Sequence, residues 1–102
     1  MVNALVRRAN AAGGFATVLA KGDSTAGAIL VIAQHRGENP RALERGLGPD
    51  GNTALIAVGP AGDSREMADY WARRRRNDRD LWVIELDIAD SERFAAETIL
   101  GD

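Results

Sequence analysis

The sequence has 102 residues, of which 45% are hydrophobic and 27% are charged, and its formal net charge is −2. These values fit one folded globular domain and exclude a disordered chain. The absence of cysteine and the presence of one histidine exclude disulfides, thiolate catalysis and the usual Cys or multi-His metal sites. No apolar run approaches the ~20 residues of a membrane span, and no signal-peptide pattern is present, so we expect a cytoplasmic protein without membrane contact.

The first half of the sequence predicts a helix followed by four strands. Apolar residues at helical spacing place the helix at residues 3–12, and Gly13 ends it. The strands are short apolar or alternating runs, expected at residues 15–21, 28–35, 41–47 and 54–58. Turns rich in glycine, proline or polar residues are expected at residues 22–27, 36–40 and 46–52. Pro60 and Gly62 are expected to break the last of these strands.

The second half of the sequence predicts a helix, a strand and a final helix. A capping box that begins at Asp63 starts a helix at residues 64–77. A strand at residues 81–88 and a helix at residues 90–100 follow. The order α-β-β-β-β-α-β-α favours a single α+β domain over residues 1–102, with a mostly antiparallel sheet of about five strands flanked by three helices.

The densest charge in the sequence lies at residues 73–80, with five arginines and two aspartates. This local charge of +3 leaves −5 for the rest of a chain whose net charge is −2, which disfavours a general nucleic-acid binder but leaves room for a local anion site. Consecutive helical residues point in different directions, so Arg73–Arg76 do not form one flat patch. Arg74 follows Trp71 by three residues, and we expect its stem to cover that indole ring.

The remaining arginines are candidates for an anion site or a partner-binding site. Arg75, Arg76 and Arg79, together with Lys21, could bind phosphate, nucleic acid or an acidic partner. The simpler interpretation is a solvated helix end, where cations are favoured by the helix dipole. The sequence leaves both interpretations open.

Four carboxylates in the same region form a candidate acidic site, namely Asp78, Asp80, Glu85 and Asp87. Glu85 and Asp87 share one face of the predicted strand, roughly 7 Å apart. A Mg²⁺-dependent hydrolase or nuclease would need all four to converge, with the chain's only lysine, Lys21, nearby. Pairing with arginine or plain solvation is the favoured interpretation, so no catalytic residue, metal ligand or cofactor is assigned.

The sequence favours a non-enzymatic binding or protein-interaction module, acting as a homodimer or with another protein. It contains no nucleophile paired with a base and no cofactor-binding loop, and the aromatic and arginine residues between Tyr70 and Trp82 offer a contact surface. A nucleic-acid or phosphate binder and a small metal-dependent hydrolase are the alternatives. Whether the protein is an enzyme stays open.

The segments ALVRRANAAGGFATVLAKGD, AGAILV and RRRRNDRDLWVIELDIADSERF cover much of the chain, and the last is the most specific. Together they resemble the small bacterial family catalogued as domain of unknown function 1491. The resemblance implies a free-standing cytoplasmic bacterial protein and carries over no catalytic residues. It also groups Lys21, Gly22 and Asp23 with the Arg/Asp segment, which raises the question of whether the two meet in space.

Overall fold

The elements of the computed structural model, which describes residues 1–25 and 27–101, follow the predicted order. They are α1 (Val2–Ala11), β1 (Phe15–Ala20), β2 (Ile29–His35), β3 (Glu38–Leu47), β4 (Thr53–Ala61), α2 (Ser64–Asn77), β5 (Trp82–Asp87) and α3 (Ser91–Ile99). Over the described residues the protein is an α+β fold of three helices and a mostly antiparallel five-stranded sheet, as predicted. The turn predicted at residues 22–27 includes Ala26, which lies outside the described residues.

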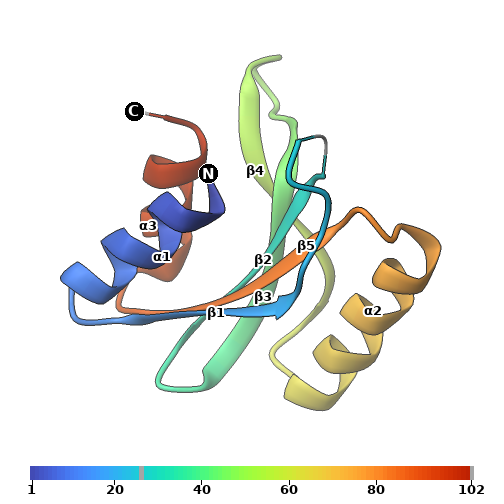
Figure 1. Cartoon of the computed structure of the whole chain (residues 1–102), viewed down its shortest axis with the longest axis horizontal. Coiled ribbons are helices and arrows are strands. Elements are labelled where there is room, and N and C mark those ends of the chain that lie inside the picture. Colours follow the sequence, from blue (N-terminus) through green and yellow to red (C-terminus); the bar gives the residue numbers. More distant parts are fainter. Residues whose placement is uncertain (26, 102) are drawn as a thin grey trace.

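The strands form one twisted sheet in the order β1-β5-β2-β3-β4 (Figure 1). Neighbouring strands are antiparallel, except that β5 runs parallel to β2 with Trp82 opposite Ile29. The last strand in sequence is therefore inserted between the first and the second. This position accounts for its apolar character on both faces, because Val83 and Ile84 point to opposite sides and both are inaccessible to solvent.

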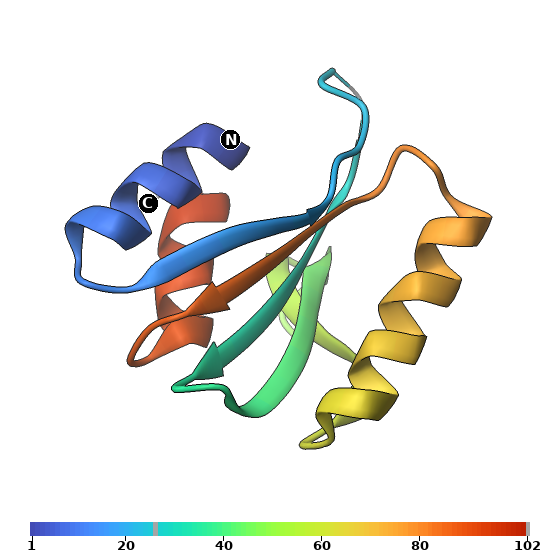
Figure 2. The same ribbon diagram turned by 60° about the horizontal axis from the view of Figure 1, so that its bottom comes forward.

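Helices pack on both faces of the sheet (Figure 2). α1 and α3 lie together over one face, where the buried core consists of Leu5, Ala9, Val31, Ala33, Leu43, Ile84, Leu86, Ala95 and Ile99. α2 lies over the opposite face, where the core consists of Leu30, Ile32, Ala42, Met67, Leu81 and Val83. Each fully buried aliphatic side chain contributes about 1.5–3 kcal/mol to stability. In the described part of the chain, no helix has both the length and the apolar character needed to cross a membrane.

Two predicted boundaries around the strands differ from the structure. β4 continues through Pro60 to Ala61, so the prediction that Pro60 breaks this strand is wrong. Proline is tolerated there because β4 is an edge strand and its register with β3 shifts at that end. The turn predicted over residues 36–40 is shorter than expected, because β3 already begins at Glu38.

A carboxylate from β5 fixes the tight turn between β2 and β3. Arg36 and Gly37 have φ angles of 56° and 73°, the signs typical of a type I′ hairpin turn. Asp87 accepts hydrogen bonds from the backbone N–H groups of Arg36 (2.7 Å) and Gly37 (3.0 Å), and from the side-chain amide of Gln34 (3.3 Å). The carboxylate thereby satisfies two backbone donors and stabilises a left-handed conformation that arginine rarely adopts.

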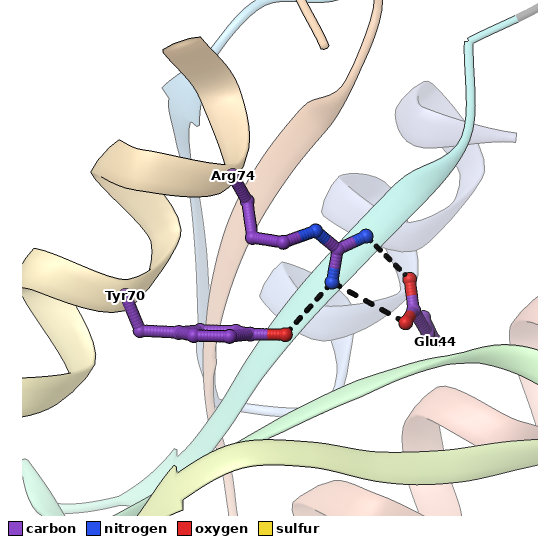
Figure 3. Close-up of polar contacts among 3 residues, drawn as sticks. All are labelled: Glu44, Tyr70 and Arg74. Atoms are coloured by element: carbon purple, nitrogen blue, oxygen red, sulfur yellow. Dashed lines mark hydrogen bonds and ion pairs between the residues drawn. The ribbon is translucent and has the colours of Figure 1, made fainter. Parts of the chain in front are cut away.

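An ion pair between Arg74 and Glu44 holds α2 on the sheet (Figure 3). The guanidinium donates to both carboxylate oxygens, at 2.8 and 3.3 Å, and also to the Tyr70 hydroxyl at 2.8 Å. The side chains of Arg74 and Glu44 are 31% and 27% exposed, so both are partly withdrawn from water. The hydrogen bond to Glu44 is the main cause that raises the pKa of Arg74 above its ordinary value. Arg74 therefore stays charged at every pH at which a protein is handled.

The guanidinium of Arg74 lies beside Tyr70, whereas the contact of its stem with the Trp71 indole stays a prediction. The guanidinium carbon is 5.8 Å from the centre of the Tyr70 ring, one helical turn toward the N-terminus. Helical side chains lean in that direction, which makes a contact with residue i−4 favourable. The acidic partner, Glu44, comes from β3, and no local pattern in the sequence indicates it.

We expect Arg74→Met to lower the free energy of unfolding by about 2 kcal/mol, because Glu44 and Tyr70 lose a partly buried, charge-assisted donor. Urea denaturation measures this loss. The control is Arg73→Met, at the exposed neighbouring position, where we expect a change below about 0.5 kcal/mol. Equal losses in the two variants would contradict the assigned role.

We expect Asp87→Asn to cost about 1–2 kcal/mol, because the turn N–H groups lose a charged acceptor. Thermal unfolding checks this, with Asp80→Asn as the control at an exposed position before the other end of β5. Adding Arg36→Gly should recover part of the loss, since glycine adopts positive φ without strain. No recovery would show that the backbone strain at the turn is negligible.

Candidate functional site

The candidate site lies where the end of α2 meets the segment that follows β1. Trp71, Ala72, Arg75, Arg76 and Arg79 line an open depression of about 510 Å³, called here the arginine depression. Trp71 and Arg75 are one helical turn apart, which puts them on the same side of α2. The structure therefore brings the three arginines predicted as an anion site onto one surface.

The backbone of Lys21 orients Arg75 within this depression. Nη2 of Arg75 donates to the Lys21 carbonyl oxygen at 2.8 Å, while its Nε is buried without a hydrogen-bond partner in the described part of the chain. Because a guanidinium has five N–H donors, this contact fixes the group and leaves other Nη donors for a ligand. Lys21, predicted as a ligand through its ammonium group, takes part through its carbonyl, and its side chain is exposed.

The segment after β1 packs closely against the start of β5. The Asp23 N–H donates to the Asp80 carbonyl at 3.0 Å, and the Trp82 indole N–H donates to the Asp23 carbonyl at 2.8 Å. A Cβ atom at Gly22 would collide with the Asp80 carbonyl, so this approach requires glycine. The two segments that the sequence resemblance grouped therefore do meet in space.

Arg76 and Arg79 supply the exposed charge of the arginine depression. Neither forms an ion pair with any described residue. The carboxylate of nearby Asp78 accepts a hydrogen bond from the Asp80 N–H at 3.1 Å and so stabilises the turn after α2. Two unpaired guanidinium groups beside an indole ring are suited to a compact anion, which each guanidinium can bind with two parallel hydrogen bonds.

The four predicted carboxylates do not converge. Asp78 and Asp80 precede β5 and Asp87 ends it, so Asp80 and Asp87 are separated by roughly 20 Å of extended chain. Asp87 is already engaged by the β2–β3 turn, and Glu85 faces α2 beside Trp71. Among the described residues, no three His, Asp or Glu side chains are grouped so as to hold a metal ion. The arrangement that a metal-dependent hydrolase requires is not found in this part of the chain.

Trp71 lines the arginine depression but was not among the residues predicted to bind an anion. Its most direct sequence interpretation is a core residue, and part of the ring does pack against the core under α2. The other part forms a wall of the arginine depression. The available signal was the spacing of Trp71 and Arg75 at i and i+4, which places the two side chains on one side of α2.

A larger depression, of about 560 Å³, lies between the β2–β3 hairpin and the start of α3. Its lining mixes charges of both signs, and Arg41 and Glu92 approach each other to 4.0 Å across it. Because opposite charges alternate there, it selects no single class of ligand. The arginine depression has a lining of one sign and is therefore the better candidate.

Comparison with known proteins gives a family but no activity. The family model described as "Protein of unknown function (DUF1491)" matches residues 1–96. No match was found among curated proteins.

The solved structures that are similar to this chain include the following two. One is the crystal structure of a DUF1491 family protein from Caulobacter crescentus CB15, whose sequence is 36% identical to this one. The alignment covers 91% of this chain and 88% of the Caulobacter chain, with a TM-score of 0.78. The other is the solution structure of protein Atu0922 from A. tumefaciens, whose sequence is 33% identical. The alignment covers 85% of this chain and 80% of the Atu0922 chain, with a TM-score of 0.65. With the family model matched over nearly its whole length, this chain belongs to the DUF1491 family.

Proposed function

We propose that this protein is a non-enzymatic interaction module that binds an acidic segment of a partner protein in the arginine depression. One observation carries the proposal, namely that Arg75, Arg76 and Arg79 gather beside Trp71 in a lining without a carboxylate. Guanidinium groups bind carboxylates through paired hydrogen bonds, and arginine and tryptophan are enriched where protein interfaces are strongest. The hydrogen bond from Arg75 to Lys21 supports the proposal further, since it orients one of the guanidinium groups in advance.

The charge distribution favours a short acidic segment over a nucleic acid. Residues 73–80 carry +3, whereas the rest of the chain carries −5. A long polyanion would extend past the depression onto the rest of the chain, whose net charge is negative, while a compact carboxylate group would not. Nucleic acid is therefore the alternative that the test must include.

The proposal places the protein in the bacterial cytoplasm, as one domain over residues 1–102 without a bound cofactor. A bacterial origin is supported by the two similar structures, which come from Caulobacter crescentus and A. tumefaciens. The absence of cysteine is consistent with a reducing compartment. The proposal includes self-association of the protein, through a surface other than the arginine depression.

We expect the double variant Arg76→Gln/Arg79→Gln to bind a fluorescein-labelled hexaglutamate peptide at least about tenfold more weakly than the unmodified protein, because it loses two charge-assisted contacts. Fluorescence anisotropy at low ionic strength measures the affinity. The control is Arg65→Gln/Arg73→Gln, which removes the same charge from exposed positions of α2 outside the depression. Its affinity should change less than threefold, on the order of a screened surface charge.

A parallel titration with labelled oligothymidylate distinguishes the two classes of ligand. Preference for the peptide supports the proposal. Tighter binding of the oligonucleotide, with a steep dependence on salt, would replace it by the nucleic-acid alternative. Absence of peptide binding at low salt, or equal losses in the two double variants, would overturn it.

A further inference from the structure

We propose that a second copy of this chain pairs with the free edge of β1, so that two sheets join into one antiparallel sheet across a twofold axis. β1 hydrogen-bonds to β5 on one side, and no strand of the described chain lies along its other side. The end position of β1 in the sheet is visible in Figure 2. Such an edge presents a row of backbone donors and acceptors that another strand can complete.

The β1 edge lacks the features that usually prevent strand pairing. Its sequence, FATVLA, contains no charged residue and no proline. The other edge strand, β4, carries Pro60, a positive φ at Gly59 and a shift in register at the same end. Charges, prolines and bulges are the means by which edge strands are kept from associating. β1 is therefore the edge better suited to a partner strand.

Exposed apolar side chains flank this edge on both faces of the sheet. Phe15 pairs with Asp87, which lies two residues after Glu85 on β5 and therefore on the same, α2 side of the sheet. Phe15 is 71% exposed. Val18 lies on the α1 side, because it pairs with Ile84, and it is 41% exposed. A partner placed on one face would cover only one of the two side chains. A strand that continues the sheet covers both, and this favours edge pairing over docking on a face.

The sequence of β1 is complementary to itself in an antiparallel register. A twofold axis perpendicular to the sheet keeps each face on its own side, so paired residues must point to the same face. Centring the axis on Thr17 places Phe15 opposite the second copy's Leu19 and Ala16 opposite the second copy's Val18. Each pair is uncharged, and the two threonines meet at the axis. A charged strand would find no counter-charge on β1, so the fitting partner is an uncharged strand, and β1 of a second copy is such a strand.

The contact is small, which sets the concentrations at which it should be seen. Pairing of two six-residue strands buries less than the ~1,200 Å² of a stable protein interface. We therefore expect a weak dimer, formed between about 1 µM and 1 mM protein. The residues that line the arginine depression come from α2 and the turn after it and not from β1, so the two proposals concern different surfaces.

We expect analytical ultracentrifugation to show a monomer–dimer equilibrium that Thr17→Lys weakens at least about tenfold, because it places like charges opposite each other at the axis. The matched control is Thr53→Lys on β4, which is exposed like Thr17 and should leave the equilibrium unchanged. Far-UV circular dichroism checks that both variants are folded. A monomer at every concentration, or a dimer sensitive to Thr53→Lys and not to Thr17→Lys, would overturn the proposal.

Crosslinking tests the register itself. The chain has no cysteine, so a single Thr17→Cys variant forms a disulfide only between copies. We expect oxidation to give a covalent dimer of Thr17→Cys, since residues paired across antiparallel strands have Cβ atoms within about 5.5 Å. Thr53→Cys should remain monomeric under the same conditions. Equal yields from the two variants would exclude the β1 register.

The two proposals fail separately. Thr17→Lys should bind the hexaglutamate peptide as tightly as the unmodified protein, and Arg76→Gln/Arg79→Gln should dimerise normally. If Thr17→Lys abolished peptide binding, the independence of the two surfaces would be wrong. A partner strand from a different protein, with this chain monomeric alone, would assign the edge to strand addition by that protein and reject the second copy.

Discussion

The bidentate ion pair between Arg74 and Glu44 is the interaction on which the candidate site depends. It fixes the rotation of α2 about its own axis, because Arg74 must face the sheet to reach both carboxylate oxygens. Successive helical residues are turned by about 100°, so this constraint directs Arg75 toward the β1 side and Arg76 to the solvent. Four adjacent arginines are thereby divided, one serving the fold and two facing a possible ligand, with Arg73 outside both groups.

β5 connects this helix to the rest of the molecule. Before the strand, the Asp80 carbonyl accepts a hydrogen bond from the Asp23 N–H of the segment after β1. At the end of the strand, the Asp87 carboxylate accepts hydrogen bonds from the backbone of the β2–β3 turn. The polar groups at both ends of β5 therefore form hydrogen bonds that stabilise the fold. This explains why a region rich in carboxylates gathers no metal site among the described residues: its acidic groups are spread along the strand.

The order and type of the elements were predictable, because each rests on a periodicity of a few residues. Helices 3–12 and 64–77 have apolar side chains at helical spacing, and the strand at 81–88 alternates. Pro60 was misjudged because the tolerance of a strand for proline depends on whether it lies at a sheet edge. The position of the Arg74 guanidinium beside Tyr70 was not predicted, because Glu44, which binds the same guanidinium, is 30 residues away in sequence.

The local patterns of the sequence are sufficient to establish the α+β class, the order of the elements and the concentration of arginine at the end of the helix at residues 64–77. The strand order, which makes β1 an edge strand of the described sheet, became known from the three-dimensional structure, as did the contacts of Lys21 with Arg75 and of Asp23 with Asp80. The difference arises from the distance along the chain between the residues that interact. Local patterns act between residues a few positions apart, whereas these contacts join residues more than 50 positions apart and exist only once the hydrophobic cores on both faces of the sheet have formed.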